Sequence, residues 1–202
     1  LNRRKIFQFL CLHPCSRIES ISSNISLSRP SVSWHLDCLI DAGYVQVFQD
    51  NKTKRYYPLG LISTKNLRTY SILGREHCMP IYQAVLRNPG ADTGFLIGEC
   101  NISTSIMTGC LKNLLDIGFI TRVTDGRHAR YFPTEKCVNN LKDEMAAIKD
   151  FIRVLIRKMA DEHLKPELTD LKGPNLVIEI MVLGQKERFY IPHRIFLPLE
   201  IE

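Results

Sequence analysis

Residues 28–45, SRPSVSWHLDCLIDAGYV, place an apolar stripe beside an unusual polar face. Val32, Leu36, Leu39 and Ile40 recur at helical spacing, so this stripe can join a hydrophobic core. The other face offers hydroxyl, guanidinium, indole and imidazole groups: Ser28, Arg29, Ser31, Ser33, Trp34 and His35. Such groups can bond to base edges or phosphates, and a helix N-terminus favours phosphate. The pattern predicts a helix, 28–42, that reads the major groove of duplex DNA.

A basic β-ribbon is expected directly after this helix. Strand-like runs at 44–48 and 54–58 flank a turn at 51–53. This wing, 44–58, would lie beside the sugar–phosphate backbone or in the minor groove. Its basic residues are Lys52, Lys54 and Arg55.

The distribution of charge favours the same end of the chain. Residues 1–75 hold eleven Lys and Arg against four Asp and Glu, whereas residues 76–135 hold five against six. Residues 136–202 hold eleven of each, so the formal net charge of +6 comes entirely from the first third. A polyanionic partner is therefore expected to bind there.

The sequence repeats itself at an offset of 75 residues. IFQFLCLHP at 6–14 aligns with IYQAVLRNP at 81–89, and TKRYYP at 53–58 aligns with HARYFP at 128–133. Between them, SRPSVSWHLDCLIDAGYV aligns with STSIMTGCLKNLLDIGFI at 103–120 without a gap. Two long copies indicate tandem small domains rather than the turns of a solenoid.

Each copy is predicted to hold three helices and a two-stranded ribbon. The first helix should end near Pro14 or Pro89, because proline disfavours helical conformation in the preceding residue. Ser28 or Ser103 can cap the third helix, which should stop at the following glycine, Gly43 or Gly118. Short second helices are expected at 17–24 and 93–100, and the strands of the second ribbon at 119–123 and 129–133.

Helix, helix, turn, helix and ribbon is the order of a winged helix-turn-helix domain. Residues 28–58, including RYYPL, resemble the recognition helix and wing of ArsR- and MarR-like regulators common in bacteria and archaea. The pattern of those regulators is S-x-x-[ST]-V-S-x-H-L-x-x-L-x-x-A-G-L-[VI]. The resemblance is looser over 103–133, where Gly109 and Cys110 replace Trp34 and His35. It implies a cytoplasmic, sequence-specific regulator of transcription that binds double-stranded DNA.

The second copy offers a sparser set of groups for a possible second DNA contact. Its helix and ribbon present Ser103, Thr104, Ser105, Thr108, Lys112, Arg127, His128 and Arg130. An architectural or partner-binding role for this copy is an equal alternative, because its net charge is slightly negative.

A heptad pattern occupies the helix expected at 136–172. Its apolar residues are spaced alternately by three and four: Val138, Leu141, Met145, Ile148, Ile152, Leu155 and Met159. A seam of this kind predicts pairing with a second copy, hence a homodimer. Packing of the stripe on the helix's own domain is the alternative.

The expected fold class is mainly α with small β-wings (α+β). The predicted domains are winged helices at 1–75 and 76–135, the dimerisation helix at 136–172 and a β-rich segment at 173–202. Because two strands alone are marginally stable, the last segment should pack on the other domains or extend the sheet of a partner.

Seven cysteines without a C-x-x-C pair predict reduced, buried thiols, and neither a metal site nor a cofactor is expected. The cluster Cys11, His13 and Cys15 lacks a zinc spacing. No apolar run is long enough to span a bilayer, so no membrane contact is expected.

No nucleophile-and-base pattern or phosphate loop indicates an enzyme. The remaining alternative to a DNA-binding regulator is a tandem winged-helix adaptor of the chromosome-segregation type, which would bind protein instead. The excess of positive charge in the first third favours DNA.

Overall fold

The computed structural model describes residues 2–126, 128–170, 175–182 and 184–192, with the backbone alone at 137–145, 170 and 192. The chain divides into two compact units. Unit 1 combines Leu1–Leu67 with Asp143–Glu202, and unit 2 is Arg68–Lys142. These bounds differ from the predicted 1–75 and 76–135, since the carboxy-terminal part of the chain belongs to the same unit as the amino-terminal part.

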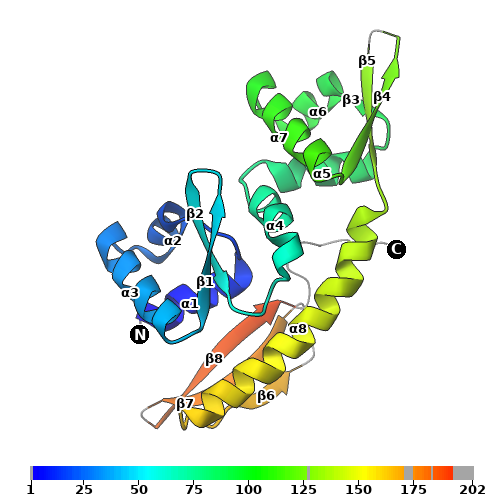
Figure 1. The fold of residues 1–202 in the computed structure, drawn as a ribbon. Coiled ribbons are helices and arrows are strands. Elements are labelled where there is room, and N and C mark those ends of the chain that lie inside the picture. Colours follow the sequence, from blue (N-terminus) through cyan, green and yellow to red (C-terminus); the bar gives the residue numbers. More distant parts are fainter. Residues whose placement is uncertain (1, 127, 171–174, 183, 193–202) are drawn as a thin grey trace. The chain divides into compact units, whose positions relative to one another are not determined.

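Three helices and a hairpin form the amino-terminal part of unit 1 (Figure 1). They are α1 (Asn2–Leu12), α2 (Ile18–Ile25), α3 (Arg29–Asp41), β1 (Val45–Asp50) and β2 (Thr53–Pro58). The core between the helices contains Ile6, Leu10, Ile21, Val32 and Leu36, all fully buried. Each such side chain contributes roughly 1.5–3 kcal/mol relative to an exposed position.

Local chemistry sets the ends of α3, as predicted. The Ser28 hydroxyl accepts a hydrogen bond from the Ser31 N–H at 3.4 Å, and Pro30 lies in the first turn. Gly43 follows the helix with φ +68°, a conformation that costs glycine little. A backbone bridge between Ser16 and Tyr56 adds a short third element to the β1–β2 sheet.

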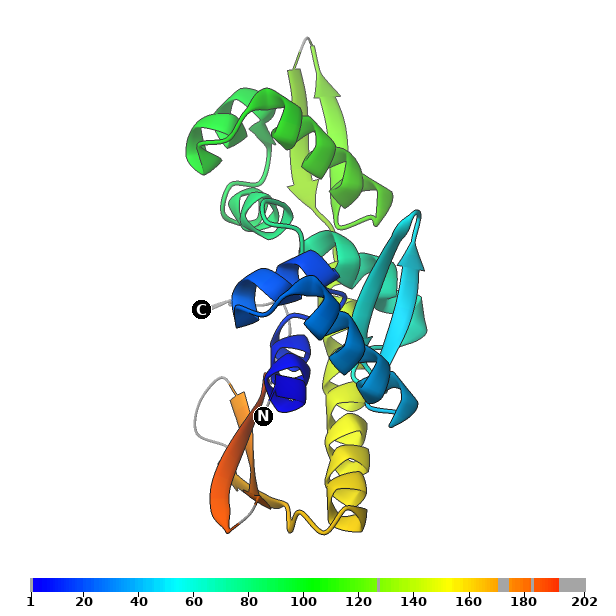
Figure 2. The same ribbon diagram turned by 90° about the vertical axis from the view of Figure 1, so that its left-hand side faces the viewer.

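The carboxy-terminal part of unit 1 is a three-stranded antiparallel sheet, ordered β6-β7-β8 (Figure 2). The strands are β6 (Glu167–Asp170), β7 (Asn175–Val182) and β8 (Gln185–Pro192). The Gln8 side-chain amide donates to the Tyr190 carbonyl at 2.5 Å and accepts from the Tyr190 N–H at 2.7 Å. This pair joins α1 to β8, so the segment packs on the amino-terminal part of unit 1, which is one of the two expected arrangements.

The long helix α8 (Lys136–Asp161) carries the heptad stripe and ends eleven residues before the predicted 172. Ile148, Ile152, Leu155 and Met159 are buried within this single chain, with Phe151 beside them. For these four positions the stripe is therefore intramolecular packing, and the predicted dimer seam needs correction. The side chains of Val138, Leu141 and Met145 lie outside the described residues.

Unit 2 repeats the element order of the amino-terminal part. It contains α5 (Cys78–Arg87), β3 (Ala91–Asp92), α6 (Thr93–Cys100), α7 (Thr104–Asp116), β4 (Ile120–Asp125) and β5 (His128–Pro133). The sheet order is β3-β5-β4. Short helices η1 (Thr64–Asn66) and α4 (Leu67–Leu73), which the sequence did not predict, precede these elements. No helix in the described ranges is both long and apolar enough to cross a membrane.

Candidate nucleic-acid interface

The outward face of α3 is centred on the only tryptophan of the chain. Val32, Leu36 and Leu39 point inward, and the Trp34 side chain on the opposite side is 60% exposed. Asp37 and Asp41 lie three and seven residues further along the same face, both exposed. These two carboxylates were not among the predicted contacts, although their helical spacing from Trp34 is present in the sequence.

The other predicted residues of α3 differ in their accessibility. Arg29 is exposed in the first turn of α3, with its Nη1 3.8 Å from Oε1 of Glu19 in α2. Ser31 and Ser33 are half-buried. His35 is also half-buried, with its ring centroid 4.8 Å from that of Trp34. Its Nδ1 is buried and makes no hydrogen bond to any residue that the structure describes, so a DNA contact of His35, which stays a prediction, would use Nε2.

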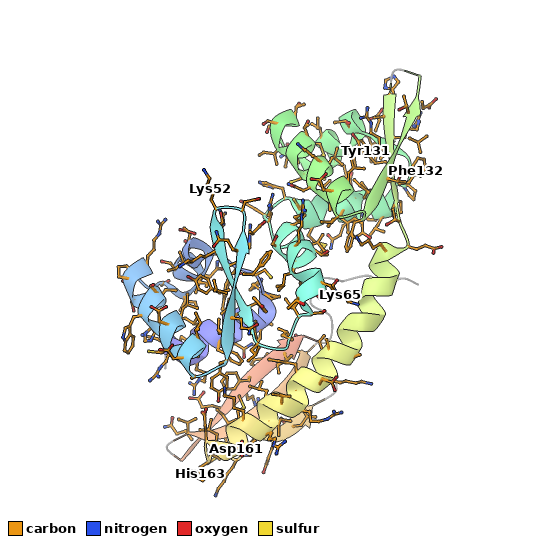
Figure 3. All side chains as sticks on the ribbon, viewed as in Figure 1. Lys52, Lys65, Tyr131, Phe132, Asp161 and His163 are labelled. Atoms are coloured by element: carbon orange, nitrogen blue, oxygen red, sulfur yellow. The ribbon has the colours of Figure 1, made fainter. Side chains whose placement is uncertain are left out.

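Lys52 lies at the tip of the wing β1–β2 (Figure 3). Lys54, in the strand β2, is exposed as well. Arg55 is a correction, because alternation along β2 turns this residue inward and leaves it 8% exposed. Its Nε lies 2.8 Å from Asp50 Oδ2, and its Nη1 donates to the Cys15 carbonyl at 3.1 Å. Arg55 therefore joins the wing to the loop between α1 and α2.

The second copy builds the same arrangement at the equivalent positions. Arg130 Nε lies 2.6 Å from Asp125 Oδ2, and Nη1 donates to the Gly90 carbonyl at 3.2 Å. Hydrogen bonding to the guanidinium lowers the pKa of Asp125 below its usual value. Arg130 is thus engaged in the same kind of structural contact as Arg55, although its side chain is 45% exposed.

The remaining candidates of the second copy lie mostly on the surface. Ser103 caps α7 by accepting from the Ile106 N–H at 3.4 Å, and Thr108 donates to the Thr104 carbonyl at 2.8 Å. Ser105, Lys112 and His128 are exposed candidates that make no such backbone contact to the described residues. Arg127 lies outside the described residues.

The two outward faces differ in chemistry at matching positions. Gly109 and Lys112 of α7 replace Trp34 and Asp37 of α3. The α7 face therefore has no aromatic side chain at its centre, although Ile106 is 39% exposed one turn earlier, and Lys112 offers an ammonium group for phosphate. The α3 face offers an indole and carboxylates, and a carboxylate can accept a hydrogen bond from cytosine N4.

Arg17 adds an exposed positive charge outside the predicted set of DNA contacts. It occupies the N-cap position of α2, and Glu19 lies in the first turn of the same helix. Within the described part of the chain it makes no ion pair. A guanidinium at a helix N-terminus is well placed to neutralise a phosphate.

Lysines of α8 hold the carboxyl ends of α3 and α7. Lys158 Nζ donates to the Ala42 carbonyl and lies 4.1 Å from the centroid of the Tyr44 ring. In unit 2, Lys136 Nζ donates to the Ile117 carbonyl at 2.6 Å. A cation is favourable at a helix C-terminus, so both contacts stabilise the helices that carry the candidate residues.

The cluster near the end of α1 contains buried thiols, as predicted. Cys11 and Cys15 are almost fully buried, whereas His13 is exposed. Burial raises the pKa of the Cys15 thiol to about 12 and also raises that of Cys11. Among the described residues, no three His, Cys, Asp or Glu side chains gather as metal ligands.

Comparisons with known proteins agree with a winged helix at the amino terminus. Residues 2–47 match the model of the bacterial regulatory protein family arsR. A probable mercury resistance operon repressor from Streptomyces lividans is 39% identical over 54 residues, which is 27% of this chain. That match spans only 42% of the repressor's own length.

Solved structures resemble the chain at low similarity. A transcriptional regulator from Thermotoga maritima is 22% identical, covers 49% of this chain and 70% of its own, and has a TM-score of 0.33. ScpB from Mycobacterium tuberculosis is 14% identical, covers 69% and 94%, and has a TM-score of 0.28.

Proposed function

We propose that the chain is a sequence-specific DNA-binding regulator of transcription with an ArsR-type winged helix at its amino terminus. In this proposal α3 enters the major groove and the β1–β2 wing contacts the backbone or minor groove. The match of residues 2–47 to the arsR family supports the proposal most strongly. The regulator function of the matched repressor supports it as well.

The roles of individual residues follow from their exposure. Trp34, at the centre of the outward face, would contact a sugar or a thymine methyl group, and Arg29 would bond to guanine or phosphate. Lys52 and Lys54 would neutralise backbone phosphates and carry no sequence information. Arg55 has no direct role, because its guanidinium is held inside the protein.

Unit 2 is proposed to be a second winged helix with an auxiliary role. The 75-residue offset relates its helices, its ribbon and the Arg130–Asp125 contact to those of unit 1. Lys112 is the side chain of α7 best suited to a phosphate contact. A reading role is not proposed for α7, because Gly109 leaves the centre of its face without a side chain.

Selection of bound fragments from a random DNA pool tests the proposal directly. The selected site is then titrated at several salt concentrations while the emission of Trp34, the only tryptophan, is followed. We expect quenching of Trp34 on binding and an affinity that falls steeply with salt, because counterions are released. Lys54→Gln should lower the slope of log K against log[salt] by about 0.9.

A matched control for this variant is Lys149→Gln on the exposed side of α8, which should leave the slope unchanged. No enrichment of any sequence, together with a Trp34 emission that DNA does not alter, would refute the proposal. If a co-purifying protein, and not DNA, alters the Trp34 emission, the result would favour the adaptor alternative.

A further inference from the structure

Two thiols of unit 2 lie in direct contact. Cys78 is the first residue of α5, and Cys110 lies in the interior of α7, which packs against α5. The Cys78 thiol donates a hydrogen bond to Cys110 Sγ at a sulfur–sulfur distance of 2.9 Å, and both thiols are free. A disulfide bond measures about 2.05 Å, so a movement of less than about 1 Å brings the two sulfur atoms to bonding distance.

The first copy of the repeat has no sulfur at either of these positions. At the offset of 75 residues, Arg3 and His35 take the places of Cys78 and Cys110. Unit 1 builds its three helices and ribbon with these residues instead. Contact between two thiols is therefore not a requirement of the fold, and it distinguishes the second copy from the first.

The two sulfur atoms differ in their access to solvent. Cys78 is fully buried, whereas Cys110 is 8% exposed. Burial, together with the hydrogen bond to Cys110, raises the pKa of the Cys78 thiol to about 12, so Cys78 stays protonated at neutral pH. Cys110 is therefore the thiol that a reagent reaches first. An opening this narrow favours a small oxidant such as hydrogen peroxide over a bulky disulfide such as oxidised glutathione.

We propose that Cys78 and Cys110 form a reversible disulfide when the protein meets hydrogen peroxide, and that this bond cross-links α5 to α7. The Cys110 sulfur attacks one peroxide oxygen, the O–O bond breaks, and the thiol proton leaves with the second oxygen as water. The Cys78 sulfur then attacks the sulfenic sulfur of Cys110, the S–O bond breaks, and the Cys78 proton leaves with the hydroxide as a second water. The two thiols together lose two electrons, which reduce the peroxide.

The expected consequence is a more stable unit 2. The bond joins residues 32 positions apart in the chain. A cross-link of this kind removes conformational entropy from the unfolded chain, so the oxidised form should unfold at a higher temperature than the reduced form. Neither the bond nor this effect depends on the proposed binding of DNA.

Peptide mapping of the full chain after treatment with hydrogen peroxide tests the disulfide. Remaining thiols are blocked with iodoacetamide before digestion with trypsin, which cuts after Arg75, Arg87 and Lys112. We expect residues 76–87 and 88–112 in one cross-linked product, lighter than the two peptides by the two hydrogen atoms that oxidation removes. Dithiothreitol should separate the peptides, and oxidised glutathione should yield less of the product than peroxide does.

Cys100 provides a matched control, because the peptide 88–112 contains it as well as Cys110. Cys100→Ser should preserve the cross-linked product, whereas Cys78→Ser and Cys110→Ser should abolish it. The proposal is overturned if the folded wild-type protein yields no such product, if the product persists in Cys110→Ser, or if oxidised glutathione is as effective as peroxide.

Thermal unfolding followed by far-ultraviolet circular dichroism tests the effect of the cross-link. We expect peroxide treatment to raise the unfolding midpoint by at least about 5 °C, and dithiothreitol to reverse the rise. Cys100→Ser should show the same rise, and Cys110→Ser should show none. A disulfide that forms without raising the midpoint would overturn the proposed stabilisation.

Discussion

The Arg55–Asp50 ion pair tests how burial changes the contribution of an ion pair to stability, because the chain contains an exposed copy of the same contact. The Arg55 side chain is 9% exposed and that of Asp50 is 11% exposed. The equivalent Arg130 and Asp125 are 45% and 61% exposed. Both arginines also donate to a backbone carbonyl, so the comparison holds the geometry nearly constant while burial changes.

Arg55→Met should destabilise unit 1 by about 3 kcal/mol. Removing one partner of a buried ion pair typically costs about 3–5 kcal/mol, and the residual hydration of Asp50 favours the lower end. The substitution also removes the hydrogen-bond donor to the Cys15 carbonyl, and a buried backbone carbonyl left without a donor is unfavourable. With a urea dependence of about 1–3 kcal/mol per molar, the unfolding midpoint should fall by about 1–3 M.

Trp34 fluorescence during urea unfolding is the assay, since the only tryptophan lies in unit 1. Arg130→Met, followed by far-ultraviolet circular dichroism, should shift the midpoint by less than the error of the titration. The reasoning is refuted if Arg55→Met leaves the Trp34 midpoint unchanged, or if Arg130→Met proves as destabilising. Under conditions in which the Arg55→Met variant is folded, its DNA binding should keep the salt dependence of the wild type, because Arg55 contacts no phosphate in the proposed complex.

Three further outcomes are expected. Lys158→Met should destabilise unit 1 by about 1 kcal/mol, because it removes the cation at the end of α3 and its cation–π contact with Tyr44. Urea unfolding followed by Trp34 fluorescence measures this loss, and the control Lys149→Met should leave the midpoint unchanged. Burial raises the pKa of the Cys15 and Cys78 thiols from 9.0 to about 12 in the folded protein. Between pH 9 and 12 the unfolded chain therefore loses these protons first, and the free energy of unfolding should fall by about 1.4 kcal/mol per pH unit for each thiol, a decline that Cys15→Ala should flatten. Ser28→Ala should cost about 1 kcal/mol through loss of the α3 cap, and the same fluorescence assay would contradict this if the midpoint did not move.

The sequence predicted the elements of the winged helix well, because short-range chemistry determines their ends. Ser28 caps α3 and Gly43 terminates it, and each effect involves only a few neighbouring residues. The third element of each ribbon was missed, because the Ser16–Tyr56 bridge is a single residue pair and β3 has only two residues. Segments this short carry no periodic signal.

The assignment of Arg55 to DNA shows where residue type misleads. A basic residue on a ribbon predicts a phosphate contact, but the alternation of β2 decides which face carries it. Arg55 and Arg130 match at the repeat offset, and both bind an aspartate five residues earlier in the chain. That shared spacing is a structural signal, and it was present in the sequence as the pairs Asp50–Arg55 and Asp125–Arg130.

The heptad stripe illustrates a second limit of pattern reading. Apolar periodicity identifies the face of a helix that will be buried, but the hydrophobic effect is non-directional and does not select the partner. In α8, Leu155 and Met159 are buried inside unit 1, while Val154 on another side of the helix is 63% exposed. Any association of two chains through this half of α8 must therefore use a surface other than the heptad stripe. Substituting Val154 is consequently a more direct test of dimerisation than substituting Leu155, whose loss would first destabilise the monomer.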